Sequence, residues 1–197
     1  MKNLNKILED HKLWLNDKTK GKRANLRFAK LQDADLRFAE LQGANLRGAN
    51  LRFANLQGAD LRFAELRGAN LRFANLRFAD LLFAELQGAN LRFAELRGAN
   101  LRFADLRFAE LQGADLRFAD LQDANLQGAE IDFSCLHLSC NSLQIKTDER
   151  IRRQLMYHVA SLMKYTDNLT DEEKNILEKI TSYANKFHRV GNDVESL

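Results

Sequence analysis

The chain has 197 residues, of which 45% are hydrophobic, and a formal net charge of +3. It contains no apolar run long enough to cross a bilayer and no hydrophobic segment of a secretion signal, so we expect a cytoplasmic protein with no membrane partner. Its two cysteines are too few for a disulfide framework.

Residues 1–23 predict a short helix followed by a basic linker. Apolar side chains and one histidine recur at helical spacing over residues 3–16, and Gly21 marks a break after them. The segment carries seven basic and three acidic residues, with Lys18, Lys20, Lys22 and Arg23 close together. Such a run is more often a solvated tether than a nucleic-acid contact, and we expect no direct nucleic-acid binding.

From Ala24 to Ala129 alanine occupies every fifth position, and a leucine, or finally Ile131, follows two residues later. This spacing gives twenty-two units of the form Ala-(Asn/Asp/Glu)-Leu-(Arg/Gln)-(Phe/Gly), with few departures. A period of five fits neither a helix nor a straight strand, because both would send successive leucines to different faces. The chain must turn within each unit, with Ala and Leu inward, so the sequence predicts an all-β solenoid.

The run Ala24 to Phe28, repeated through Ala129 to Phe133, resembles the pentapeptide repeat family. The resemblance implies a right-handed quadrilateral β-helix with four units in each coil. We expect three segments: 1–23 as an N-terminal capping helix and basic linker, 24–143 as the β-helix with degenerate last units, and 144–197 as a C-terminal helical hairpin. We also expect the first helix to cover the first coil and Trp14 to seal it, because solenoid ends need caps.

The C-terminal segment predicts two amphipathic helices. The first covers about residues 147–165, and the second opens at Thr170, three residues before Glu173, in a capping box. Their apolar faces predict either a cap or a homodimer contact. The candidate dimer residues are Ile151, Leu155, Met156, Ile176, Ile180, Tyr183 and Phe187.

Two columns of outward side chains are candidate partner surfaces if the coil has twenty residues. The first is an acidic column, and the second is an arginine column on the opposite side, where stacked cations invite a partner carboxylate. A solvated surface with weak ion pairs is the plainer interpretation of both. The members are Glu40, Asp60, Asp80 and Asp120 in one column, and Arg52, Arg72 and Arg92 in the other.

The fifth position of the unit is phenylalanine or glycine in almost every unit. Phenylalanines one coil apart predict stacked ladders, for example Phe53 with Phe73 and Phe63 with Phe83. The corners at Gly48, Gly68 and Gly88 are expected to differ in geometry from the others, because glycine permits positive φ. An apolar stripe for a partner is the alternative role of the phenylalanines.

No catalytic, cofactor or metal site is predicted. The regular repeat lacks Ser, Thr, Cys, His and Tyr, and Cys135, His137 and Cys140 have no fourth ligand nearby. We therefore expect a non-enzymatic scaffold that binds an unknown protein partner. The family resemblance implies an alternative, a DNA mimic that binds or protects DNA gyrase or topoisomerase. Against it, the repeat carries fourteen basic and fifteen acidic residues, while a duplex is densely negative.

Overall fold

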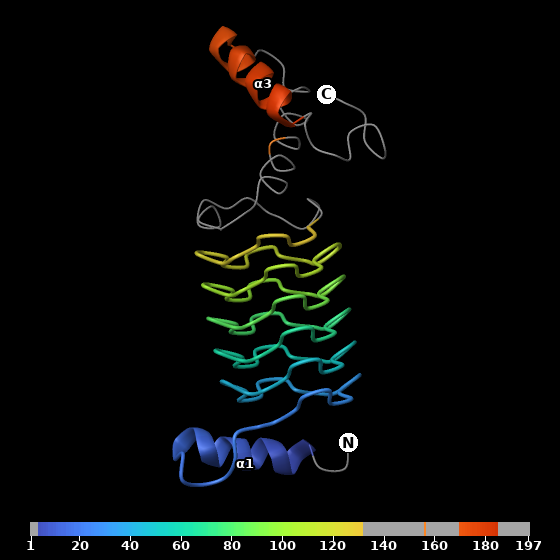
Figure 1. Cartoon of the computed structure of the whole chain (residues 1–197), viewed down its shortest axis with the longest axis vertical. Helices are drawn as coiled ribbons and strands as arrows, with labels where there is room; N and C mark the ends of the chain where they lie inside the picture. The colour runs from blue at the N-terminus through green and yellow to red at the C-terminus, as the bar shows by residue number, and fades with distance from the viewer. Residues whose placement is uncertain (1–3, 132–155, 157–169, 185–197) are drawn as a thin grey trace. The chain divides into compact units, whose positions relative to one another are not determined.

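The computed structural model describes residues 4–131, 156 and 170–184. It divides the chain into two compact units, 1–146 and 147–197. Helix α1 (Leu4–Asn16) and the β-helix belong to the first unit, and helix α3 (Asp171–Ala184) belongs to the second (Figure 1).

The repeat forms a β-helix whose coils contain twenty residues. The second residue of each unit pairs in parallel with the residue twenty positions later, from Asn25 with Asn45 to Glu110 with Glu130. Each pairing uses two ladder bonds: Leu26 N–H donates to the Asn45 carbonyl, and Asn45 N–H donates to the Ala24 carbonyl. The coil of four units that the resemblance implied is therefore confirmed, and Figure 1 shows the coils stacked one on another.

Each unit closes with a tight turn. The N–H of the next alanine donates to the leucine carbonyl three residues earlier, as from Ala79 to Leu76 at 3.1 Å. The fifth residue of the unit has φ between +53° and +70°. Positive φ at the third turn residue alone is the signature of a type II turn, so the chain changes direction between the fourth and fifth residues of every unit.

The expected difference at the glycine corners is wrong. Phe78 has φ of 57°, and Gly88 has 61°, so phenylalanine and glycine adopt the same left-handed backbone. Glycine has another role at several corners, because a Cβ on Gly98 would lie 2.7 Å from the Phe78 ring. The phenylalanine of one coil thus occupies the space that a side chain on the next coil would need.

The interior consists of leucine, alanine and one isoleucine. Every central leucine from Leu26 to Leu126 has at most 3% of its surface exposed, and each alanine from Ala44 to Ala129 at most 5%. Burying a leucine side chain contributes about 1.5–3 kcal/mol. The inward Ala and Leu pair predicted from the spacing is confirmed, and it accounts for the hydrophobic core of the solenoid.

In most units a side chain accepts the backbone N–H of the fourth residue. In every unit with Asn or Asp in the second position, the side-chain Oδ1 accepts this N–H, for example Asn75 from Arg77 at 3.1 Å. A glutamate carboxylate stands one methylene further from the backbone, and among the described residues no glutamate unit makes this bond. The frequent Asn and Asp of the repeat therefore complete the backbone hydrogen bonding of the turn.

Helix α1 contacts the first coil through His11 and Lys12. His11 is fully buried, and its Nδ1 accepts the Ala24 N–H at 3.1 Å. Trp14 is only half-buried and stacks on His11 with 5.5 Å between ring centroids, so the expectation that Trp14 makes the seal is wrong. The break at Gly21 is confirmed: it has φ of 65°, and a Cβ there would lie 2.0 Å from the Asp10 carbonyl oxygen.

Helix α3 begins directly after Thr170, where the sequence placed its start. The Thr170 carbonyl accepts the Lys174 N–H at 2.9 Å, the first bond of the helix. The predicted helix over about 147–165 lies outside the described residues except for Met156, so the hairpin stays a prediction.

Candidate interaction surface

The β-helix has four sides, which we name after the first central leucine of each. Successive units supply the Leu26, Leu31, Leu36 and Leu41 sides, and the fifth unit returns to the Leu26 side. The predicted arginine column lies on the Leu31 side and the predicted acidic column on the opposite Leu41 side. Outward residues of one side therefore form rows with one side chain per coil.

The acidic column on the Leu41 side is largely paired with cations. Arg62 Nη2 lies 2.6 Å from Asp60 Oδ2, and Arg62 Nε lies 3.7 Å from Asp80 Oδ2. Partial burial raises the pKa of Asp60, but hydrogen bonds from the Arg62 side chain and backbone outweigh it and leave this pKa below its ordinary value. The column is brought together as predicted, but these contacts offset part of its negative charge.

The two ends of the acidic column are also paired. Lys12 of helix α1 reaches Glu40 at 2.7 Å, and Arg102 Nε lies 3.8 Å from Asp120 Oδ2. These side chains are between 41% and 62% exposed, so each pair contributes less than about 1 kcal/mol to stability. Their main effect is on the surface potential, which becomes a mixture of charges rather than an acidic stripe.

The arginine column on the Leu31 side has no carboxylate partner among the described residues. Instead, its guanidinium groups lie over phenylalanine rings: Arg52 and Arg72 each place Cζ 4.8 Å from the ring centroid of the following phenylalanine, and Arg92 lies 5.9 Å from its own. Cation–π contacts at exposed sites contribute about 0.5–1 kcal/mol. The structure therefore brings the three predicted arginines together and orders them on an aromatic support.

The predicted phenylalanine ladders are confirmed. Ring centroids are 5.0 Å apart for Phe53 and Phe73 and 5.2 Å apart for Phe73 and Phe93, with the rings within 11° of parallel. A second ladder of Phe63, Phe83 and Phe103 follows the Leu41 side. These spacings also give the distance between successive coils, about 5 Å.

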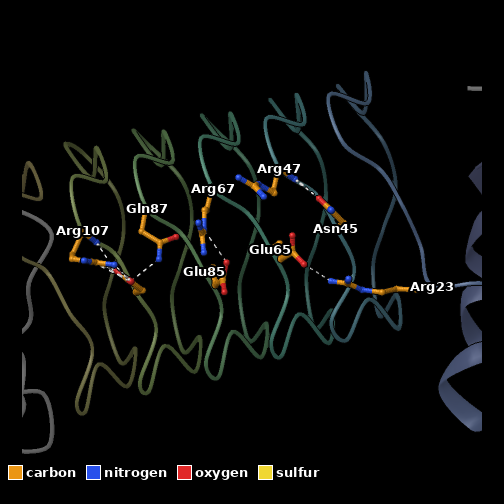
Figure 2. Close-up of polar contacts among 9 residues, drawn as sticks. Arg23, Asn45, Arg47, Glu65, Arg67, Glu85, Gln87 and Arg107 are labelled. Atoms are coloured by element: carbon orange, nitrogen blue, oxygen red, sulfur yellow. Dashed lines mark hydrogen bonds and ion pairs between the residues drawn. The ribbon is translucent and has the colours of Figure 1, made fainter. Parts of the chain in front are cut away.

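The Leu26 side carries a line of polar contacts that the sequence did not indicate (Figure 2). Arg23 donates to Glu65 at 2.5 Å, and Arg67 donates to Glu85 at 2.9 Å. One coil further on, Gln87 donates to Asp105, which also accepts from Arg107 at 2.7 Å. In the contacts of Arg67 with Glu85 and of Gln87 with Asp105, a fourth-position donor meets a second-position carboxylate eighteen residues later, a relation that becomes visible only when the coil length is known.

The charged side chains of the Leu26 side form ion pairs. The Arg107 side chain and backbone, with help from Gln87, hold the pKa of Asp105 below its ordinary value despite partial burial, which acts in the opposite direction. In the part of the chain that the structure describes, no three His, Cys, Asp or Glu side chains are grouped as a metal would require. Cys135, His137 and Cys140 lie outside that part.

The structure describes some of the candidate dimer residues and not others. Met156 is 39% exposed and Ile176 is 46% exposed, while Ile180 is half-buried. The side chains of Ile151, Leu155, Tyr183 and Phe187 lie outside the described residues.

Neither described helix is long and apolar enough to cross a membrane.

A comparison of the sequence with models of known protein families agrees with the observed repeat. The family model for pentapeptide repeats matches residues 22–52, 54–92 and 94–132 in eight copies, which is more than half of the chain. The chain belongs to the pentapeptide repeat family. Comparison with functionally curated proteins gave no match.

Several solved pentapeptide repeat proteins resemble it. Rfr23 from the cyanobacterium Cyanothece 51142 is 37% identical over 56% of this chain and 65% of its own, with a TM-score of 0.41. HetL from Nostoc sp. strain PCC 7120, described as involved in heterocyst differentiation regulation, is 39% identical over 59% of this chain and 63% of its own, with a TM-score of 0.37. This chain therefore spans less than two thirds of either relative.

A trypsin-treated form of QnrB1, described as a plasmid-mediated fluoroquinolone resistance protein, is similar over a longer stretch. It is 23% identical over 75% of this chain and 72% of its own, with a TM-score of 0.50. At this identity the similarity concerns the fold.

Proposed function

We propose that this pentapeptide repeat protein is a non-enzymatic scaffold that presents rows of outward side chains to a protein partner. The observation that supports this most is the division of each unit into a buried Ala and Leu pair and an outward surface of charged, amide and phenylalanine side chains. The ladder between coils fixes the spacing of those rows. Within the repeat, arginine contacts hold the pKa values of Asp35, Asp60, Asp105 and Asp115 below their ordinary value, which suits ion pairing rather than acid–base catalysis.

Photo-crosslinking from one side at a time tests the scaffold. A benzophenone amino acid is placed separately at Arg72, Gln87, Arg97 and Leu82, one on each side of adjacent coils, in cells that make the protein. If the scaffold has a defined partner surface, probes on one side yield a crosslinked polypeptide. A probe on the same side one coil further along yields the same polypeptide. Equal crosslinking from all four sides, or none from any, would contradict it.

The family resemblance keeps gyrase binding as the alternative. The pairing of Asp60 and Asp80 with Arg62 weakens it, because a duplex mimic needs dense unpaired negative charge. A supercoiling assay with purified gyrase decides the matter. Inhibition of supercoiling, or protection from a quinolone, at micromolar protein would replace our proposal, and no effect would remove the alternative.

We further propose that the unit formed by residues 147–197 joins two copies of the chain. The exposed Met156 and Ile176 support this, since a contact between proteins is one way to remove exposed large apolar side chains from water. A twofold dimer is the commonest assembly that would cover them. The alternative is that the same apolar residues cap a single chain.

A further inference from the structure

The Leu31 side differs from the other three sides in its central coils. Three successive units there have the same sequence from the second to the fifth position, beginning at Asn50, Asn70 and Asn90. None of the three contains an acidic residue. The rows of arginines and phenylalanines that result are therefore uniform along three coils.

The arginines of these units are ordered but not neutralised. Arg72 lies over two rings of the phenylalanine ladder, 4.8 Å from the Phe73 centroid and 5.6 Å from the Phe93 centroid. The Nε atoms of Arg72 and Arg92 are buried beneath the surface. No ion pair to a described residue engages these guanidiniums, whereas Arg37, Arg107 and Arg117 on other sides each have an aspartate at 2.7 Å.

We propose that Arg52, Arg72 and Arg92 form a docking column for a short acidic segment of a partner protein. Charge complementarity favours this partner. Three guanidiniums at intervals of about 5 Å present their outer N–H groups, and a carboxylate accepts two such N–H groups from one arginine. Alternate carboxylates on an extended segment are roughly 6–7 Å apart, within the reach of arginine side chains. This inference rests on the proposed scaffold function and specifies the partner's chemistry.

The ends of the column set the length of the segment. Asp33 lies at the corner of the same side in the first coil, and Glu110 lies in the fifth coil, where it accepts a hydrogen bond from Asn90 at 2.8 Å. These carboxylates would repel a longer polyanion. A segment of about six residues, whose alternate side chains present two or three carboxylates to the column, fits between them.

Single-stranded nucleic acid fits this side less well than an acidic polypeptide. Nucleic-acid surfaces use aromatic faces on which bases stack. Here the faces of Phe53, Phe73 and Phe93 are directed at one another and covered by guanidiniums. The surface offers charge and outward ring edges but no stacking platform.

Binding of a fluorescein-labelled hexaglutamate peptide to the full chain, followed by anisotropy at low salt, tests the proposal. Substituting Arg52, Arg72 and Arg92 together by Gln should weaken binding at least tenfold and reduce its salt dependence. The matched control, with Arg37→Gln, Arg107→Gln and Arg117→Gln, removes the same charge from ion-paired positions and should change binding less than threefold. Arg72→Gln alone, expected to weaken binding about threefold, keeps the test available if the triple variant unfolds.

Three results would overturn the proposal: no hexaglutamate binding to the wild type, equal weakening by both triple variants, or tighter binding of labelled hexathymidylate than of hexaglutamate. Crosslinking distinguishes this failure from failure of the scaffold. Crosslinks from one side other than the Leu31 side would support the scaffold function but not the arginine column. Equal crosslinking from all four sides, or none from any, would contradict the scaffold function itself.

Discussion

The Nδ1 atom of His11 accepts the backbone N–H of Ala24 at 3.1 Å, and this bond joins helix α1 to the first residue of the β-helix. An acceptor nitrogen carries no proton, so the contact requires neutral histidine. Burial lowers the pKa of His11, and the nearby cations Lys18 and Arg23 act in the same direction, while the Gln42 backbone opposes them. The cap is therefore coupled to pH.

We expect the cap to lose stability as the pH falls below about 6.5, the ordinary pKa of histidine. Since the folded form binds the proton less readily than the unfolded form, the stabilisation is complete above this pH and lost below it, at up to about 1.4 kcal/mol per pH unit. Trp14, the single tryptophan, stacks on His11 and reports the change by fluorescence. His11→Asn, which keeps an acceptor but does not titrate, should flatten the Trp14 response; an unchanged response would exclude His11 as its source.

The side-chain bond to the fourth N–H is testable with two residues of one row. Asn75→Ala removes the acceptor of the Arg77 N–H and should lower the free energy of unfolding by about 1 kcal/mol. Glu95, paired with Asn75 in the next coil, is the control, since Glu95→Ala removes no such acceptor and should change stability by less than about 0.5 kcal/mol. Urea unfolding measures both, and equal losses would show that the bond adds nothing.

Glycine at the corners tolerates the left-handed backbone, and at some corners it also leaves room for the phenylalanine ring of the preceding coil. Alanine substitutions separate these two effects. Gly88→Ala meets nothing within 4 Å and should cost about 1 kcal/mol from the left-handed backbone alone. Gly98→Ala adds a clash with the Phe78 ring and should cost at least about 1 kcal/mol more. Thermal unfolding measures the difference. In a Phe78→Ala background the extra cost of Gly98→Ala should disappear, and its persistence would rule out the ring contact as the cause.

The dimer proposal depends on residues 147–197. Sedimentation of the full chain at micromolar concentration should give a dimer, and a chain ending at Lys146 should give a monomer. Replacing Ile176, which is 46% exposed, by Asp should shift the full chain toward monomer, because a charge would then be buried in the contact. A monomeric full chain would leave the apolar residues as part of a cap.

The sequence predicted the interior well because the core follows directly from spacing. Leu76 and Ala79 had to point inward in any solenoid with this period, and both are buried. The number of sides depended on the family resemblance, since no residue within a unit encodes how many units form a coil. The coil length then determines which outward residues are neighbours, which is why the contact of Arg67 with Glu85 was missed.

The corners and the cap could not be predicted for different reasons. Positive φ at Phe78 is unfavourable for an isolated residue, and only the hydrogen bonds between coils impose it on every fifth position. The burial of His11 instead of Trp14 depends on which face of helix α1 meets the first coil. The sequence placed Arg52, Arg72 and Arg92 on one side of the coil, but their position over phenylalanine rings required side-chain geometry.

Each unit divides into inward residues that form the core and outward residues that form the surface. Leu76 is fully buried, and Arg77 lies outward, with Cζ 5.9 Å from the Phe78 ring. The most direct test is cooperative unfolding of two variants, Leu76→Lys and Arg77→Ala. Leu76→Lys buries a charge without a partner and should abolish the cooperative transition, whereas Arg77→Ala should lower the free energy of unfolding by less than about 1 kcal/mol. Equal effects of the two substitutions would contradict this division.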